Sequence, residues 1–179
     1  MNRRAFLSAA SAAALATPAL GYTVPVHLRP TRIAVRDAYA PGTVVVIPQT
    51  HFLYWMEEGG TAMRYGVGVG RAGLEFQGVA DVARKAEWPS WTPTPDMIAR
   101  NPERYAQYAG GVPGGPDNPL GSRALYLYQD GVDTYYRIHG TTSPRSIGRS
   151  VSNGCIRMVN AHIEDLYERV PIGTPVHVL

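Results

Sequence analysis

A single cysteine and the histidine that precedes it form the strongest candidate for chemistry in this sequence. Cys155 is the only cysteine among 179 residues, and His139 lies fifteen intervening residues before it. A cysteine attacks a carbonyl carbon as a thiolate, and a free thiol, with a pKa of about 8.5, needs a base or positive surroundings to ionise. A histidine with one ring nitrogen held by a partner supplies that base. We therefore interpret Cys155 as a nucleophile and His139 as its general base.

The turn around the cysteine has the composition that acyl transfer requires. Ser152-Asn153-Gly154-Cys155 offers consecutive backbone N–H groups for a developing negative charge. Gly154 permits backbone angles and a close substrate approach that a β-carbon would hinder. Arg157, two residues beyond the cysteine, suits a substrate carboxylate because its guanidinium matches that group's geometry. The segment therefore predicts a complete acyl-transfer site.

Each of these residues taken alone has a plainer interpretation. A lone cysteine is most often a small buried hydrophobe, and a histidine at a strand end is usually structural. A zinc site made by the same pair with His162 lacks any standard ligand spacing. Arg157 is also placed to pair with Glu164 or Asp165. No single residue decides between these alternatives.

The flanking segments predict short strands that would position the pair. Runs rich in β-branched and aromatic residues predict strands at 43–47, 51–56, 61–69, 78–85, 123–128, 134–139 and 174–179, with a short edge strand at 33–35. Asp130-Gly131 is a hairpin signal between two of them and delivers His139 at a strand end. The expected fold class is mostly β, an antiparallel sandwich or barrel-like domain with one or two short helices.

Two helices are expected, and neither begins at the cysteine. Asn101-Pro102 predicts a short helix over 102–108, and Asn160 is expected to cap a second helix with an apolar stripe at Ile163, Leu166, Tyr167 and Val170. Cys155 therefore lies on a connecting turn. We expect its pKa to be lowered by His139 and by the amides of that turn. The proline-rich loop at 88–95, with two tryptophans, is either a hydrophobic lid over the core or a wall of a cleft.

Length and charge suit a single domain without a polyanionic partner. The formal charge is +3, from 17 basic and 14 acidic residues, and removal of residues 1–21 leaves 15 basic residues and a charge of +1. Neither nucleic acid nor stable membrane insertion is expected from this balance.

The first 21 residues have the form of an export signal. Arg3-Arg4 precedes a weakly apolar, alanine-rich stretch that is too short to span a membrane, and Thr17 to Gly21 offers small residues for cleavage. The Arg3-Arg4-x-Phe6-Leu7 pattern resembles a twin-arginine signal, and an ordinary secretory signal is the alternative. We expect an exported protein of the periplasm or cell wall, where an unpaired cysteine is unusual.

The segment His139-Gly140-Thr141, followed after a polar loop by Ser152-Asn153-Gly154-Cys155-Ile156-Arg157-Met158, resembles the signature of the L,D-transpeptidase catalytic domain family (YkuD type). The similarity extends upstream through 115–121 and 88–95 and downstream through 170–176. We divide the chain into a signal at 1–21, a lead-in segment at 22–41 and a catalytic domain at 42–179.

The resemblance implies roles for the matching residues. Cys155 would be the nucleophile and His139 the base, with the Gly140 carbonyl orienting the imidazole. The N–H groups of Asn153, Gly154 and Cys155 would be oxyanion donors, and Arg157 a substrate contact. Asn153 departs from the family, which most often has histidine there. Because asparagine does not titrate, His139 is left as the base.

The implied activity is acyl transfer on peptidoglycan. The cysteine would attack a tetrapeptide donor at the L-centre of diaminopimelate, release D-alanine, and pass the acyl group to an amine, forming a 3→3 cross-link or attaching a partner. No cofactor or metal is expected. The alternatives are an L,D-carboxypeptidase or endopeptidase on the same site, and a non-catalytic wall-binding module. The sequence does not specify the acceptor or the oligomeric state.

Overall fold

A computed structural model describes residues 22–36, 38–74 and 76–179, and the expected export signal lies outside the described residues. Eleven strands occur in this part of the chain: β1 (Thr31–Ala34), β2 (Val44–Ile47), β3 (Phe52–Glu57), β4 (Thr61–Gly66), β5 (Val69–Gly70), β6 (Gly78–Glu87), β7 (Arg123–Gln129), β8 (Val132–His139), β9 (Ser150–Ser152), β10 (Ile156–Arg157) and β11 (Pro175–Val178). The helices are α1 (Pro95–Arg100), α2 (Pro102–Tyr105) and α3 (Asn160–Arg169). Four 3₁₀ turns cover Val26–Leu28, Pro48–Thr50, Ala106–Tyr108 and Pro144–Ser146.

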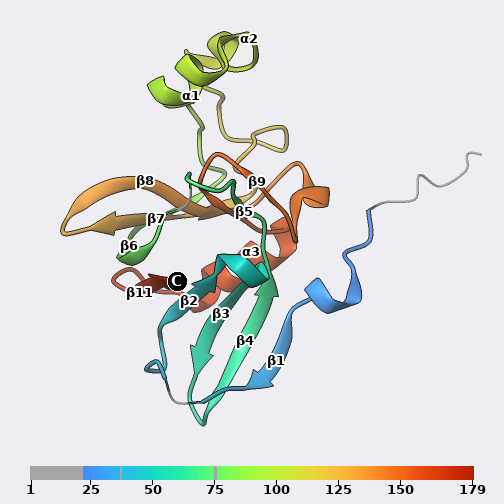
Figure 1. Cartoon of the computed structure of the whole chain (residues 1–179), viewed down its shortest axis with the longest axis vertical. Coiled ribbons are helices and arrows are strands. Elements are labelled where there is room, and N and C mark those ends of the chain that lie inside the picture. The colour runs from blue at the N-terminus through green and yellow to red at the C-terminus, as the bar shows by residue number, and fades with distance from the viewer. Residues whose placement is uncertain (1–21, 37, 75) are drawn as a thin grey trace, which may run out of the picture.

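Nine strands form one curved sheet in the order β1-β4-β3-β2-β11-β6-β7-β8-β10, and β5 pairs with β9 separately (Figure 1). The predicted mostly β, mostly antiparallel class is confirmed. The sheet is nevertheless mixed, because β11 is parallel to β2, and β10 is parallel to β8. These long-range parallel pairings have no local sequence signal, so the sequence did not predict them.

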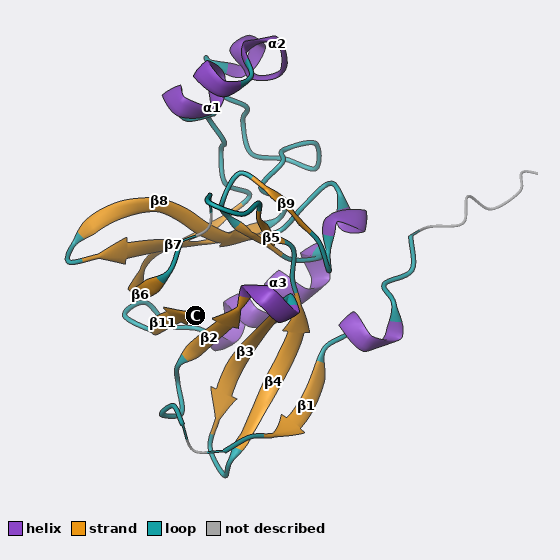
Figure 2. Ribbon diagram, in the orientation of Figure 1, coloured by secondary structure: helices purple, strands orange, loops and turns teal. Residues whose placement is uncertain are grey.

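The core lies between the curved sheet and α3, which packs against β7 and β8 (Figures 1 and 2). The predicted helical stripe is confirmed: Ile163, Leu166 and Val170 are fully buried. Lys85, the only lysine, closes the far end of the helix by donating to the carbonyls of Tyr167 and Val170. An ammonium at a helix C-terminus satisfies carbonyls that have no partner within the helix.

Asn160 does not cap α3, so that prediction was wrong. The cap position is Val159, and the Asn160 carboxamide turns away from the helix end. Its Oδ1 accepts the N–H of Thr141 at 3.0 Å and that of Ser122 at 3.4 Å. A β-carbon on Gly121 or Gly140 would lie 2.2 or 2.3 Å from this oxygen, so both positions require glycine. Asn160 therefore joins the start of β7 to the segment that follows His139.

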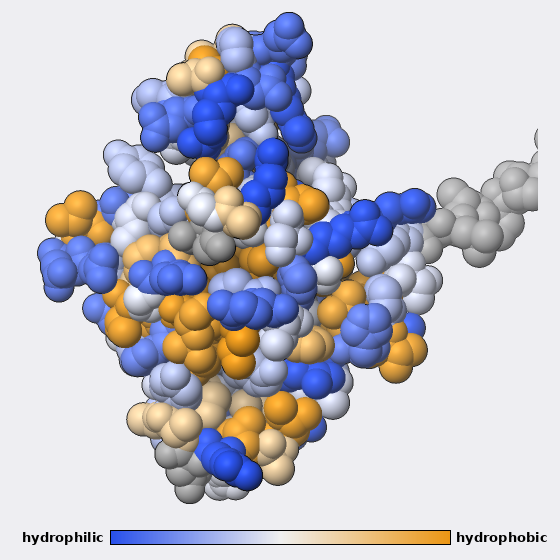
Figure 3. Space-filling model, in the orientation of Figure 1, coloured by the Kyte–Doolittle hydropathy of each residue, from blue (hydrophilic) through white to orange (hydrophobic). Residues whose placement is uncertain are grey.

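Residues 89–121 form a lid that carries α1 and α2 and projects beyond the sheet (Figures 1 and 2). The helix predicted over 102–108 is present as α2 and the 3₁₀ turn that follows it. α1 was missed because three prolines dominate the preceding segment, yet Pro95 occupies a first-turn position and the Thr94 hydroxyl accepts the N–H of Met97. The outer surface of the lid is mostly hydrophilic (Figure 3).

We expect Asn160→Ala to lower the free energy of unfolding by about 1–3 kcal/mol, because it leaves two backbone N–H groups beside His139 without an acceptor. Urea denaturation measures the change. Gln129→Ala, an amide truncation at the exposed tip of β7, is the control and should change stability by less than about 0.5 kcal/mol. Equal effects in the two variants would contradict the stabilising hydrogen bonds assigned to Asn160.

Candidate active site

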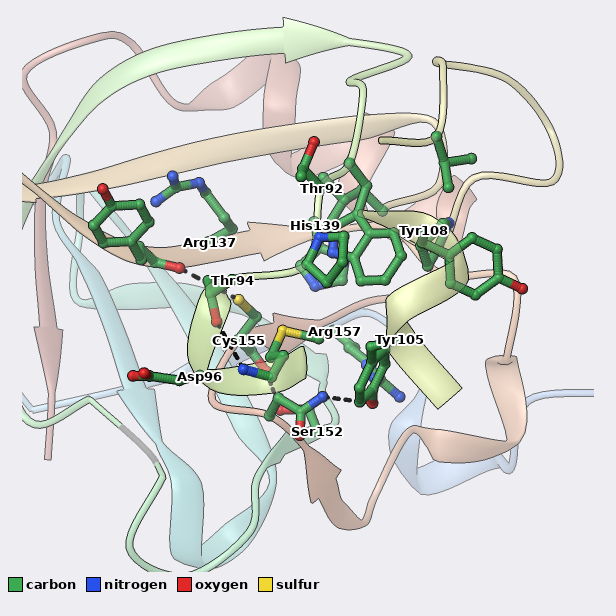
Figure 4. Close-up of a pocket in the computed structure, with 18 of the residues that line it drawn as sticks. Thr92, Thr94, Asp96, Tyr105, Tyr108, Arg137, His139, Ser152, Cys155 and Arg157 are labelled. Carbon is green, nitrogen blue, oxygen red and sulfur yellow. Dashed lines mark hydrogen bonds between the residues drawn. The ribbon is translucent and has the colours of Figure 1, made fainter. Parts of the chain in front are cut away.

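The parallel pairing of β10 with β8 brings the predicted site residues together. Ile156 lies opposite Ile138, and Arg157 lies opposite His139. Both isoleucines are buried in the core, so the alternating residues face the other side of the sheet. Cys155, one residue before β10, has its Sγ 3.8 Å from the Tyr135 carbonyl of β8. His139, Cys155 and Arg157 consequently line one cavity (Figure 4).

The cavity has a volume of about 1120 Å³ and lies between the sheet and the lid. β8 and β10 form its floor, Ser152 and Asn153 form one side, and lid residues of α1, α2 and the 3₁₀ turn after α2 face them (Figure 4). Its size exceeds that of most drug-sized ligand sites. The space is sufficient for a segment of peptide.

Of the two tryptophans in the proline-rich loop, only Trp91 belongs to the cavity. Trp91 pairs with Val112 through two backbone hydrogen bonds of 2.9 and 2.7 Å and packs against the rings of Tyr105 and Tyr108. It is a wall of the cleft. Trp88 is 46% exposed and lies at the base of the lid, where its backbone N–H donates to the Ser122 carbonyl. It does not cover the core.

His139 is buried and held in one orientation. Its Nδ1 lies 2.6 Å from the Gly140 carbonyl oxygen, the contact that the sequence anticipated. A carbonyl only accepts, so Nδ1 carries the proton and Nε2 is left as the basic nitrogen. Burial, and secondarily the charge of Arg157, lowers the pKa of His139 to about 4, although the carbonyls of Gly140 and Leu120 oppose this. The imidazole is therefore neutral near pH 7.

The Cys155 thiol has a raised pKa, contrary to the expectation from sequence. Burial is the largest cause, and it outweighs the Arg137 N–H and the charges of Arg137 and Arg157, which favour the thiolate. A buried anion loses hydration that nearby dipoles replace only in part. The site accordingly holds a neutral thiol and a neutral imidazole near pH 7, with the thiol directed at the Tyr135 carbonyl.

Gly154 has the strained geometry that the sequence anticipated. Its φ is +130°, and a β-carbon would lie 2.6 Å from both the Leu74 carbonyl oxygen and the Tyr136 ring. Its N–H, however, donates to Ser152 Oγ at 3.1 Å, and that hydroxyl donates to the Cys155 carbonyl at 2.6 Å. The expected role of Gly154 as an oxyanion donor is therefore not supported in this conformation.

The two other N–H groups of the turn remain available. In the described part of the chain, the N–H groups of Asn153 and Cys155 have no hydrogen-bond partner. Both belong to the turn whose side chains border the cavity. They are the remaining candidate donors to a developing oxyanion.

Arg157 faces the cavity and not the acidic residues of α3. Asp165 pairs with Arg169 at 2.8 Å, so the alternative pairing with Arg157 is not realised. Within the described ranges, Arg157 forms no ion pair. Burial lowers its pKa, and the charges of Arg104 and Arg71 add to this. A guanidinium so placed gains most from an incoming carboxylate.

Sequence reasoning missed two contacts that shape the site: the hydrogen bonds of the Ser152 hydroxyl and the contact with Tyr105. The spacing of Ser152 before a glycine is typical of a hydroxyl that bonds the backbone two residues on, so this bond had a local signal. Tyr105 had none: it lies 48 positions before Asn153, whose Nδ2 donates to its hydroxyl at 2.8 Å. The asparagine in place of the family's usual histidine thus contacts the lid.

Neither a metal cluster nor a membrane span is found in the residues that the structure describes. No group of three or more His, Cys, Asp or Glu side chains is arranged around a common point. Nor does any helix of the described chain have the length and hydropathy needed to cross a bilayer.

Comparison with known proteins gives consistent matches. The family model described as the L,D-transpeptidase catalytic domain (YkuD) matches residues 41–178. The putative L,D-transpeptidase in the ATP synthase subunits region of Fuscovulum blasticum is 38% identical over 194 residues, covering 100% of this chain and 98% of the relative. The probable L,D-transpeptidase ErfK/SrfK of Escherichia coli K12 is 36% identical over 152 residues, covering 84% of this chain. The chain spans only 47% of that relative's length.

A crystal structure from Brucella melitensis, named as a probable carnitine operon oxidoreductase, is also similar. It has 52% sequence identity and a TM-score of 0.59, with 87% of this chain and 96% of that chain covered. This chain does contain a Gly68-x-Gly70-x-x-Gly73 spacing, as in dinucleotide-binding loops. Here it leads from β5 into β6 and not into a helix, so it lacks the helix N-terminus that holds a pyrophosphate.

The buried neutral imidazole makes stability depend on pH. His139 has a folded pKa of about 4 and an unfolded value of about 6.5. The contribution of the neutral imidazole to the free energy of unfolding is therefore complete above the pKa of the unfolded state. It is lost as the pH falls toward the pKa of the folded state. Between pH 7 and pH 5 this one group should remove about 2 kcal/mol of unfolding free energy.

Urea denaturation at both pH values, compared with His139→Gln, measures this contribution. The variant should show the smaller pH-dependent loss. His162, whose pKa burial also lowers, is common to both proteins and cancels in the difference. Identical pH dependence in the two proteins would rule out a buried, neutral His139.

Proposed function

The chain belongs to the family of L,D-transpeptidase catalytic domains, enzymes with a cysteine nucleophile, and we propose that it transfers acyl groups of peptidoglycan stem peptides through a thioester on Cys155. The observation that supports this most directly is the β8–β10 register, which places His139, Cys155 and Arg157 on one face of a peptide-sized cleft. The nucleophile, base and cation that the proposed reaction needs thus line one cavity.

The first half of the proposed reaction forms the thioester. Cys155 Sγ attacks the carbonyl at the L-centre of diaminopimelate while its proton passes to His139 Nε2. The oxyanion accepts hydrogen bonds from the N–H groups of Asn153 and Cys155. When the intermediate collapses, the carbon–nitrogen bond breaks, and the D-alanine amine leaves with the proton from His139. The acyl group remains on sulfur.

The second half transfers the acyl group. An acceptor amine attacks the thioester carbonyl and gives a proton to His139, and the carbon–sulfur bond breaks. The departing thiolate recovers that proton. Because burial favours the neutral form of both groups, proton transfer should accompany attack on a bound carbonyl and not precede it. A substrate that excludes water would strengthen the interactions that stabilise the charged transition state.

The charge of the cleft fits an anionic donor. Arg100 and Arg104 line the lid opposite Arg157, and none of the three has an ion-pair partner in the described ranges. A stem tetrapeptide ends in a carboxylate and carries others along its length. We assign Arg157 to a donor carboxylate near the scissile bond, with the lid arginines contributing positive potential.

The acceptor is the open part of this proposal. An amine of a second stem peptide gives a 3→3 cross-link, an amine of a protein gives attachment, and water gives carboxypeptidase activity. Mass spectrometry of the products distinguishes cross-linked dimers and protein conjugates from monomers alone. We also propose that residues 1–21 direct export to the periplasm or cell wall, where this substrate is found.

Cys155→Ala should abolish turnover of a tetrapeptide donor, with a loss of at least about 10³-fold, because Cys155 is the only cysteine in the sequence and alanine supplies no nucleophile. D-Alanine release measures turnover, and thermal unfolding verifies the fold. Incubation with a carbapenem should add one covalent adduct to the wild-type chain and none to the variant, as seen by intact mass. Retained turnover in the variant would refute the assignment of the nucleophile.

Arg157→Gln should lower kcat/KM for the tetrapeptide by about 10–100-fold, the range expected when a charge-assisted hydrogen bond is lost. Arg149→Gln is the matched control, because Arg149 is exposed and lies outside the cleft. It should change kcat/KM less than about twofold, as for a surface substitution. Similar losses in both variants would indicate a general effect of net charge and not a carboxylate contact.

A further inference from the structure

We propose that Tyr105 of the lid is a positioning residue for the nucleophile turn, acting through its hydrogen bond to Asn153. This inference rests on the proposed function and deepens it. The Asn153 Nδ2 donates to the Tyr105 hydroxyl at 2.8 Å. In the described residues, it is the only hydrogen bond between the lid and residues 150–157. Figure 4 shows Tyr105 facing the turn from the lid side.

Tyr105 is itself held firmly by the lid. Its ring packs edge-on against Trp91, with centroids 6.3 Å apart, and the Arg104 guanidinium lies 5.4 Å from its centre. Trp91 is fixed by its two backbone hydrogen bonds to Val112, and α2 is capped by Asn101, whose Oδ1 accepts the Arg104 N–H at 3.1 Å. Because these contacts hold Tyr105 within the lid, its hydroxyl is expected to move together with the whole lid.

Asn153 carries one of the two candidate donors to the oxyanion. The Gly154 N–H is committed to Ser152, which leaves the N–H groups of Asn153 and Cys155 as the candidate donors. Ser152 fixes the turn from within, through its bonds to Gly154 and Cys155. From outside the turn, the Arg71 N–H donates to the Ser152 carbonyl, and the lid adds a hydrogen bond that acts on the Asn153 side chain. Closing the lid would thus align a donor as well as cover the substrate.

A positioning role and a substrate-binding role for Tyr105 predict different kinetics. If the hydroxyl aligns the turn, its loss lowers the maximal rate of Cys155 acylation and leaves the half-saturating concentration nearly unchanged. If the hydroxyl binds substrate, the half-saturating concentration rises. A purely structural role in lid folding would move thermal stability and not the acylation rate. Acylation by a carbapenem, followed by intact mass at several concentrations, separates these quantities.

The test is a double-mutant cycle of Tyr105→Phe and Asn153→Ala. Tyr105→Phe keeps the ring and its packing on Trp91, so the lid is retained. Each single change should lower the maximal acylation rate about threefold to tenfold, as expected for one hydrogen bond. The double variant should be no slower than the slower single variant, because both remove the same bond. Effects that multiply would overturn the proposal.

Tyr108→Phe is the matched control from the same lid. Tyr108 also packs against Trp91, with centroids 5.8 Å apart, and its hydroxyl has no hydrogen bond in the described part of the chain. Any effect of Tyr108→Phe on the maximal acylation rate should multiply with the effect of Asn153→Ala, because the two changes are independent. A wild-type rate for Tyr105→Phe overturns the proposal even if Asn153→Ala fails to fold. A wild-type chain that forms no adduct would instead refute the proposed function.

Discussion

The parallel register of β10 against β8 is the constraint on which the rest of the site depends. It places Arg157 beside His139 and brings Cys155 against β8, although fifteen residues separate the histidine from the cysteine. Ile138 and Ile156 anchor the pair from the core side, where both are buried. A shift of one residue would direct the catalytic face into the core, so the hydrophobic pattern enforces the register.

The same burial that fixes the site also determines the protonation states of His139 and Cys155. Desolvation lowers the pKa of His139 and raises that of Cys155, so the two groups are neutral until substrate arrives. A neutral thiol is less susceptible to oxidation than a thiolate. The proposed reaction therefore relies on donors aligned for the oxyanion and not on a preformed thiolate.

Backbone groups and small side chains hold this arrangement together. Asn160 satisfies two N–H groups at the ends of β7 and β8, and glycines 121 and 140 make room for its carboxamide. Ser152 closes the nucleophile turn on itself, and Gly154 lets the turn pass against Leu74 and Tyr136. These contacts involve residues that are small because the backbones approach closely, which explains why glycine is frequent around the site.

The sequence alone predicted most of the longer strands, the helix that begins at Asn160 and the residues proposed for the nucleophile segment, because hydrophobic period, turn chemistry and motif spacing are local properties. It did not predict the short strands β9 and β10. Only the tertiary structure decided what depends on distant partners. The parallel pairings, the role of Asn160 and the contact between Asn153 and Tyr105 each join segments that are distant in the sequence and carry no local signal. The direction of the Cys155 pKa was likewise misjudged, because burial is a property of the packed molecule and not of the motif.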